Sequence, residues 1–259
     1  LHTKYIIMAG ANRFEALITP DSIDLMTAKK NGCKLVVLDP RYTKTAALAD
    51  EWYAIRPGTD MAFFLALANV IISEKLYDES YAADKLYGLD RLGEHVKQYS
   101  PEWAQGECDI PAAEIRRIAR ELAAAAPAAI VYPGRRTSDY VNSTQIRRAM
   151  AIINGLLGNW DQPGGLLAAR KVGLSGPELP DSPFYEDNPD DRADHGRAHM
   201  MFDEEGSFKH MRDAIIEEKP YPVKGWFAYK INPLQSVAHR NKKIGRAVQQ
   251  ECRDRYTIS

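Results

Sequence analysis

Two short apolar segments between residues 34 and 60 constrain the fold of this chain most. The segment 35–38 is short and valine-rich, which is typical of a strand that is buried on both faces. This strand ends at Asp39-Pro40-Arg41, because Pro40 donates no backbone hydrogen bond. A second strand, at residues 52–55, runs into Gly58-Thr59-Asp60 just before a helical pattern. Because ligands bind beyond the carboxyl ends of strands in an open parallel sheet, these two loops predict a binding site.

Strands and helices alternate along the first part of the chain. The helices have ordinary boundaries, such as Thr19-Pro20 at the start of the first one and Gly32 after its end. Strands are predicted at residues 4–8, 35–38, 52–55 and 128–132, and helices at residues 19–31, 45–49, 61–76, 111–122 and 143–157, with short connecting helices within residues 77–105. This order predicts an α/β fold with a Rossmann-like, parallel-sheet, dinucleotide-binding domain.

The composition changes in the second part of the chain. Residues 158–222 are dominated by glycine, proline and aspartate, and they predict a long polar loop region with one helix at residues 208–218. A last strand is predicted at residues 226–230. We therefore expect residues 1–127 to form the dinucleotide-binding domain and residues 128–242 to form part of a second α/β domain.

Residues 243–259 differ from the rest of the sequence. They can be back-translated into a common sequencing-adapter oligonucleotide, so we interpret them as a non-native tail; the alternative is a genuine amphipathic helix. The chain also begins without methionine and without a signal-like segment. We expect it to be a piece of a longer protein.

Charge and cysteine usage exclude several classes of function. A formal net charge of −1 gives no reason to expect nucleic acid or an anionic membrane surface as a partner. Cys33, Cys108 and Cys252 lie far apart and form no CxxC pair, which excludes a zinc finger or a four-cysteine iron–sulfur cluster inside the chain. His195 and His199 have the spacing of one helix face, but no third ligand accompanies them. We expect no metal site here.

Charged or glycine-containing turns follow the predicted strands. Glycine lets a backbone approach a phosphate closely, arginine can donate two hydrogen bonds to phosphate oxygens, and a carboxylate matches the two parallel donors of guanine. The candidate turns are Gly10-Ala11-Asn12, Asp39-Pro40-Arg41, Gly58-Thr59-Asp60, Gly134-Arg135-Arg136 and Asn232-Pro233. Together they predict a purine nucleotide with a pyrophosphate. Plainer alternatives are Asp60 as a helix cap, Arg41 in a surface ion pair and Asn232 in a simple turn.

The same turns lie in segments that resemble a known family. The segments are MAGANRFEA, LDPRYTKTAALADEWYAIRPGTDMAFFLALANVII, YPGRR, QIRRAMAIINGLLGNWDQPGGLL and YKINPLQS. They resemble the molybdopterin oxidoreductases, also called the dimethyl sulfoxide reductase family, and the resemblance covers residues 4–241. Within that family, PGR followed by LLGNWDQPGG is most similar to the catalytic subunits of polysulfide and thiosulfate reductases.

The resemblance implies that the chain binds a bis-molybdopterin guanine dinucleotide that carries molybdenum. The implied cofactor-binding residues are Gly10, Asn12, Asp39, Pro40, Arg41, Gly58, Thr59 and Asp60 for one dinucleotide, Gly134 and Arg135 near the pterin, and Asn232 for the second dinucleotide. In the family, the molybdenum ligand and the cysteines of a 4Fe-4S cluster would lie before Leu1. We therefore expect no catalytic residue within this chain.

The resemblance also implies an activity for the whole enzyme. It would reduce or oxidise a small substrate by two electrons at molybdenum, and the expected substrate is a sulfur compound such as polysulfide or thiosulfate. Its partners would be an iron–sulfur electron-transfer subunit and a membrane anchor subunit, and a twin-arginine signal would export it to the periplasm.

Three alternatives stay open. The first is a formate dehydrogenase or nitrate reductase of the same family. The second is a molybdenum-free scaffold like the large subunit of NADH–quinone oxidoreductase, against which the guanine-binding pattern of Asp39, Arg41, Gly58 and Asp60 argues. The third is a nicotinamide dehydrogenase, against which the lack of a glycine-rich first turn argues.

Overall fold

The computed structural model describes residues 2–16, 19–138, 140, 142–167, 193–194, 208–227 and 229. The chain divides into two compact units, residues 1–173 and residues 174–259. Each unit is described by itself. No helix among the described residues has both the length and the apolar character needed to cross a membrane.

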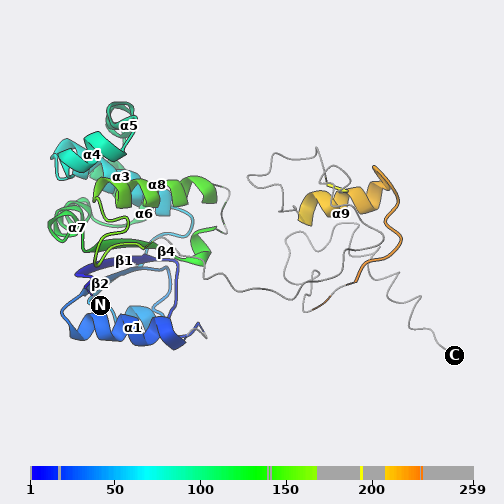
Figure 1. Ribbon diagram of the computed structural model, residues 1–259, viewed down its shortest axis with the longest axis horizontal. Helices are drawn as coiled ribbons and strands as arrows, with labels where there is room; N and C mark the ends of the chain where they lie inside the picture. Colours follow the sequence, from blue (N-terminus) through cyan, green and yellow to red (C-terminus); the bar gives the residue numbers. More distant parts are fainter. Residues whose placement is uncertain are drawn as a thin grey trace. The chain divides into compact units, whose positions relative to one another are not determined.

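A parallel sheet forms the centre of the first unit (Figure 1). Its strands are β1 (Tyr5–Ala9), β2 (Lys34–Leu38), β3 (Glu51–Tyr53) and β4 (Ala129–Pro133), in the order β3-β2-β1-β4. Tyr5 pairs with both Lys34 and Ala129, so three strands begin level and also end level. The loops that leave them therefore start at one edge of the sheet. The α/β fold with a parallel sheet is confirmed.

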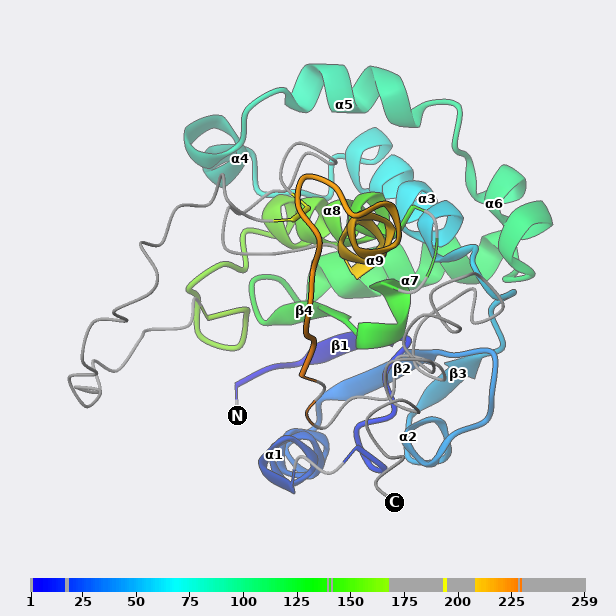
Figure 2. The same cartoon turned by 90° about the vertical axis from the view of Figure 1, so that its right-hand side faces the viewer.

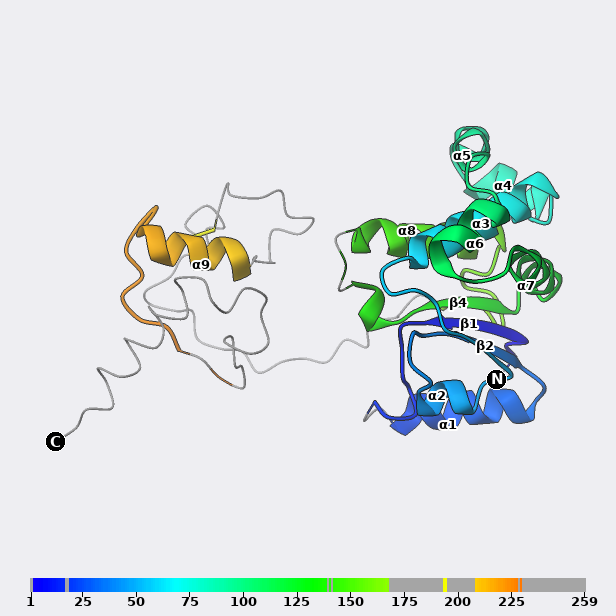
Figure 3. The ribbon, with the colours of Figure 1, turned by 180° about the vertical axis from the view of Figure 1, so that it is seen from behind.

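Helices cover both faces of this sheet (Figures 1 and 2). One face carries α1 (Thr19–Lys30) and α2 (Lys44–Ala47). The other carries α3 (Asp60–Ser73), α6 (Pro101–Cys108), α7 (Ala112–Ala124) and α8 (Ser143–Leu156), and the same two layers are seen from behind in Figure 3. Two short helices, α4 (Glu79–Lys85) and α5 (Leu89–Val96), lie outside α3 and α8.

The alternation of side chains along the strands explains the two layers, because successive residues point to opposite faces. In β1, Tyr5, Ile7 and Ala9 pack into the core under α3, α7 and α8, whereas Ile6 and Met8 pack toward α1. Both sets are buried, and such two-sided burial is the reason why these strands read as continuous apolar runs.

The outer edge of β4 is closed by an asparagine side chain instead of another strand. Asn154 of α8 accepts a hydrogen bond from the Val131 N–H at 2.9 Å and donates one to the Val131 carbonyl at 2.9 Å. The Asn159 amide donates to the Asn154 side-chain oxygen at 2.7 Å and to the Ala129 carbonyl. Both asparagines are buried. One side chain from α8 and one from the turn after it therefore satisfy backbone groups that an edge strand would leave unpaired.

A group of ion pairs stands at the beginning of the strands. Arg117 of α7 lies 2.6 Å from Glu51 and 2.7 Å from Glu121, and it also pairs with Glu114. Lys34 lies 2.6 Å from both Glu51 and Glu121. Because Lys34 and Glu51 are the first residues of β2 and β3, this network ties α7 to the strand starts.

The expected domain change near Pro127 is wrong for the first unit. The strand that follows it, β4, pairs with β1 in the same sheet, and α8 packs on α3. The described boundary between compact units falls after Gly173 instead. Pro127 marked a turn between a helix and a strand of one domain, which the local sequence alone does not distinguish from a linker.

In the second unit the structure describes α9 (Phe208–Glu217), which confirms the predicted helix. The strand expected at residues 226–230 is wrong where it can be checked: Trp226, Phe227 and Tyr229 have no strand pairing. Trp226 instead lies near Phe208, with ring centroids 6.1 Å apart. Asn232 and the segment 243–259 lie outside the described residues.

Candidate functional site

A cleft of about 350 Å³ lies beyond the carboxyl ends of the strands. That volume is within the range of roughly 300–1,000 Å³ that is usual for small-molecule sites. The cleft is lined by residues from the loops after all four strands: Gly10, Leu38, Asp39, Pro40, Arg41, Ile55, Pro57, Asp60, Arg136, Thr137 and Tyr140. Five of them, Gly10, Asp39, Pro40, Arg41 and Asp60, are among the predicted site residues.

The topology explains why a cleft forms at this edge. The segment after β1 leads to α1 on one face of the sheet, and the segment after β4 leads to α8 on the other face. Loops that leave neighbouring strands toward opposite faces open a crevice between them, which is the usual ligand position in open α/β sheets.

Two buried carboxylates face this cleft. Asp39 follows the last residue of β2 and is 7% exposed, and Asp60 begins α3 and is 5% exposed. One oxygen of Asp39 accepts a hydrogen bond from the Arg41 N–H at 2.9 Å, which folds the turn after β2. Asp60 accepts a hydrogen bond from its own backbone N–H and from no other described residue. A buried carboxylate with so few donors is poorly compensated in the free chain.

Burial raises the pKa of Asp60, and the negative charge of Asp39 raises it further. The prediction that Asp60 caps its helix needs a correction, because the cap residue is Thr59 and Asp60 is the first residue of the helix. The Thr59 hydroxyl does not cap α3 either; it donates to the Arg56 carbonyl at 2.6 Å. The side chain of Asp60 is therefore available to a ligand.

The cationic and aromatic part of the cleft comes from the loops after β2 and β4. Arg41 is exposed at one side, and Arg136 lies in the short 3₁₀ helix η1 (Arg135–Ser138) that follows β4. Tyr140 comes two residues after η1, and its ring packs on the backbone of Gly58: a Cβ built on that glycine would lie 3.4 Å from the ring. The loops after the two outermost strands thus meet across the cleft.

Two glycines let the loops after β1 and β4 approach each other. A Cβ on Gly134 would lie 2.2 Å from the Ala9 carbonyl oxygen, so no side chain fits there. Gly10 has a φ of +58°, and its carbonyl accepts a hydrogen bond from the Arg136 N–H at 3.2 Å. These glycines shape the cleft by backbone contact.

Five predicted residues do not line the cleft: Asn12, Gly58, Thr59, Gly134 and Arg135. Asn12 joins the loop after β1 to α2, since its side-chain oxygen accepts a hydrogen bond from the Thr45 hydroxyl at 2.9 Å. Its amide donates to Glu15. Gly58 supports Tyr140, and Arg135 is exposed outside the lining. The binding roles of these residues stay predictions.

Thr137 and Tyr140 line the cleft although no sequence motif singled them out, and Arg136 lines it whereas Arg135, which was predicted near the pterin, does not. The 3₁₀ turn decides which of the two arginines faces the cleft, and the sequence gives no periodic signal for that turn. Thr137 is buried, and its hydroxyl donates to the Gly134 carbonyl at 2.6 Å.

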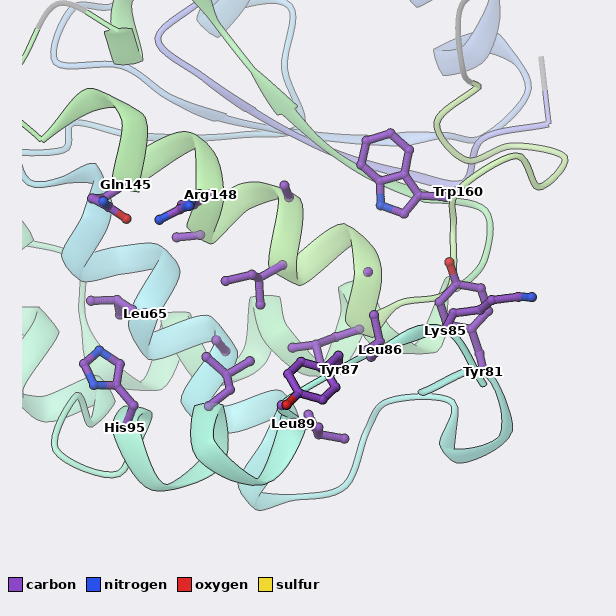
Figure 4. A pocket seen from close by; sticks show the side chains of 18 of the residues that line it. Leu65, Tyr81, Lys85, Leu86, Tyr87, Leu89, His95, Gln145, Arg148 and Trp160 are labelled. Atoms are coloured by element: carbon purple, nitrogen blue, oxygen red, sulfur yellow. The ribbon is translucent and has the colours of Figure 1, made fainter. Parts of the chain in front are cut away.

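A larger cavity of about 720 Å³ lies elsewhere, between α3, α4, α5 and α8 (Figure 4). Its lining is mainly apolar, with Leu65, Leu86 and Leu89 along it and Arg148 and Trp160 toward its two ends. None of the predicted site residues lines it, and it has no carboxylate in its lining. Its size exceeds that of the cleft, but converging polar groups identify the cleft as the better candidate site.

No group of three or more metal-ligating side chains occurs in the part of the chain that the structure describes. The lining of the cleft offers recognition chemistry: two carboxylates for donors, two arginines for anions, and apolar side chains with a tyrosine ring for a flat molecule.

Comparison with known proteins supports the resemblance seen in the sequence. The family model described as "Molybdopterin oxidoreductase" matches residues 2–252, and so includes part of the segment that we interpret as a non-native tail. The thiosulfate reductase molybdopterin-containing subunit PhsA of Salmonella typhimurium is 36% identical, over 94% of this chain and 34% of its own length. Acetylene hydratase of Syntrophotalea acetylenica is 32% identical, over 90% of this chain and 36% of its own length.

A solved structure agrees. Acetylene hydratase from Pelobacter acetylenicus matches with a TM-score of 0.60 and 35% sequence identity, covering 64% of this chain and 23% of that one. The chain spans about a third of the length of the curated relatives named above. With a family match over most of its residues, the chain belongs to the molybdopterin oxidoreductase family.

Proposed function

We propose that the cleft binds the guanine nucleotide end of a bis-molybdopterin guanine dinucleotide cofactor. The observation that carries this proposal is Asp60, a buried carboxylate that faces the cleft and accepts a hydrogen bond only from its own backbone among the described residues. Guanine presents an N–H and an amino group side by side, and this donor pair fits a carboxylate. Such a ligand would supply the donors that Asp60 lacks.

The other lining residues fit the rest of a nucleotide. Asp39 stands at the end of β2, where an acidic residue hydrogen-bonds ribose hydroxyls in dinucleotide-binding folds of this kind. The guanidinium groups of Arg41 and Arg136 suit the pyrophosphate oxygens. Gly10 contributes by letting the turn after β4 pack closely against the loop after β1, since a Cβ there would lie 3.1 Å from Thr137.

When bound, the cofactor would supply molybdenum for two-electron chemistry, and the protein would supply binding, orientation and electrostatics. Within this chain, Asp60 would fix the orientation of the base, Asp39 would position the ribose, and the arginines would balance the phosphate charge. The chain would thereby hold the distal end of the cofactor.

For the whole enzyme we propose two-electron reduction of a small sulfur compound such as thiosulfate or polysulfide. The supporting observation is the 36% identity to the thiosulfate reductase subunit. We further propose a 4Fe-4S cluster upstream of this region, an iron–sulfur partner subunit with a membrane anchor, and export to the periplasm. A second relative supports a second candidate: acetylene hydratase of Syntrophotalea acetylenica shares 32% identity over 90% of the chain, so hydration of a small molecule is the alternative activity.

Titration of the 259-residue chain with GMP, IMP and AMP by isothermal calorimetry tests the binding proposal. We expect GMP to bind most tightly, IMP less tightly because it lacks the amino group, and AMP least because it presents no matching donor pair. Asp60→Asn should reduce GMP affinity most. Asp90→Asn is the matched control, because Asp90 is an exposed acid in the first turn of α5.

Equal affinities for GMP and AMP, or no GMP binding at all, would contradict the binding proposal. Assays of thiosulfate reduction and acetylene hydration with the longer protein that we expect to contain this chain would separate the two candidate activities.

A further inference from the structure

We propose that Tyr140 is a positioning residue for the nucleotide: its ring packs on the face of the purine and covers it in the cleft. This inference rests on the proposed function, since it assumes that the cleft binds a purine nucleotide. It adds a residue that neither the sequence motifs nor the cleft's charged groups point to.

The first observation is the position of the ring. Tyr140 lines the cleft together with Asp60, and its ring packs on the backbone of Gly58, with the built Cβ of that glycine 3.4 and 3.5 Å from two ring carbons. Gly58 has a φ of +85°, so a larger residue is disfavoured there by backbone conformation, and the ring lies at ordinary van der Waals distance from it. The glycine thus provides a flat support that holds the ring in place across the cleft.

The second observation is that the ring remains partly uncovered. Tyr140 is 37% exposed, and its hydroxyl makes no hydrogen bond to another described residue. A tyrosine with a purely structural role would usually bury its ring in the core and form a hydrogen bond through its hydroxyl. The exposed part of the ring is surface that a ligand in the cleft can cover.

The third observation is the shape of the remaining lining. Leu38 and Ile55 are buried and line the same cleft. A purine whose edge reaches Asp60 is flat and apolar on both faces, and base–aromatic stacking is favourable for any base. Apolar side chains and an aromatic ring in one cleft, with a carboxylate for the edge, suit a planar base better than they suit a sugar or a phosphate.

The test compares substitutions that separate stacking from other roles of Tyr140. Tyr140→Phe keeps the ring, Tyr140→Leu keeps an apolar cover without an aromatic face, and Tyr140→Ala removes both. Tyr87→Ala is the control, because Tyr87 is almost fully exposed and lies in the segment that connects α4 to α5, away from the cleft. GMP is the probe, titrated into the 259-residue chain and observed by calorimetry and by proton NMR of the nucleotide. Circular dichroism confirms that each variant is folded.

We expect Tyr140→Phe and Tyr87→Ala to bind GMP like the original chain, and Tyr140→Leu and Tyr140→Ala to bind it roughly 5- to 150-fold more weakly, the range that corresponds to one lost base–aromatic stack. The H8 resonance of GMP should shift upfield on binding to the chains with an aromatic residue 140, because of the ring current. That shift should be absent with leucine or alanine.

Three outcomes would overturn the inference while leaving the proposed function intact. Unchanged GMP affinity in Tyr140→Ala would show that the ring contributes nothing. Full affinity in Tyr140→Leu would show an apolar cover without stacking, and a loss in Tyr140→Phe would assign the role to the hydroxyl. If the original chain binds no GMP, the proposed function and this inference fail together.

Discussion

Substitution of Asn154 by leucine tests how the open edge of the sheet is satisfied. Leucine has nearly the shape of asparagine but neither donates nor accepts hydrogen bonds. In Asn154→Leu, the N–H and carbonyl of Val131 both lose their partner, and the Asn159 amide loses one of its two acceptors, keeping the Ala129 carbonyl. Val131 is fully buried and Asn154 is 2% exposed, so water does not reach these groups without local opening.

The size of the effect follows from these contacts. An unsatisfied buried backbone group costs about 1–3 kcal/mol, so two such groups cost about 2–6 kcal/mol. The buried leucine side chain offsets about 1.5–2 kcal/mol of that cost. The difference spans about 0–4.5 kcal/mol, so we expect β4 to be destabilised by about 2 kcal/mol, a sizeable part of the stability of a domain.

Hydrogen exchange measured by mass spectrometry, together with guanidinium unfolding, gives the local and the global readout. Asn69→Leu is the matched control: Asn69 also lies in a helix and bonds one backbone carbonyl, that of Val96 at 2.8 Å, but it is only half-buried. Loss of this hydrogen bond should lower the free energy of unfolding by less than about 1 kcal/mol. If exchange in residues 129–133 is no faster in Asn154→Leu than in the original chain, the account of the edge is wrong.

Three further predictions concern the cleft and the strand starts. Asp60→Asn should raise the melting temperature of the ligand-free chain at neutral pH. Burial raises the pKa of the Asp60 carboxyl in the folded chain, so its ionised form at neutral pH destabilises the folded chain relative to the unfolded chain. Asparagine carries no charge and removes this destabilisation. An unchanged or lower melting temperature would refute this. Gly134→Ala should lower the free energy of unfolding, measured with guanidinium, by several kcal/mol, because its Cβ would lie 2.2 Å from a backbone oxygen. Gly106→Ala, at a helix position with open space around it, should raise the free energy of unfolding by about 0.5–1 kcal/mol. Similar effects of the two substitutions would count against the steric argument. For Glu51, burial acts to raise the pKa, but hydrogen bonds from neighbouring arginine and lysine outweigh it and lower the pKa to about 2. The stability that the Glu51 carboxylate contributes is present above its unfolded pKa of 4.5 and is lost as the pH falls toward 2. The difference in free energy of unfolding between the original chain and Glu51→Gln should therefore shrink over that pH range. A constant difference would contradict this prediction.

Much of the fold could be predicted because local signals and tertiary environment agree. The helix after β1 ends at Lys30, and Gly32 has a φ of +83°, as the stop signal indicated. The apolar runs became β1, β2 and β4 because both faces of the sheet are covered. The boundary at Pro127 failed because strand pairing with β1 is a long-range contact, which no local pattern reports.

The candidate site could be predicted only where a residue stands directly at a strand end. Asp39 and Asp60 were identified in this way, since their positions follow from the chain order. Arg136 and Tyr140 depend on the path of the turn after β4, which tertiary contacts with Gly10 and Gly58 determine. Asn12 has the right chemistry, but its side chain is engaged by Thr45, and chemistry without geometry cannot reveal that.

The level alignment of the strands has a consequence for how such a protein can change over evolution. The ion pair of Lys34 and Glu121 stands where β2 begins, and the cleft opens where β2 ends, a separation of roughly 17 Å for a strand of five residues. Charges so far apart are largely screened from one another at physiological salt, where the Debye length is about 8 Å. The four turns that line the cleft can therefore change in sequence to bind new ligands while the sheet and its ion pairs keep their stability. One scaffold can in this way host a succession of different specificities.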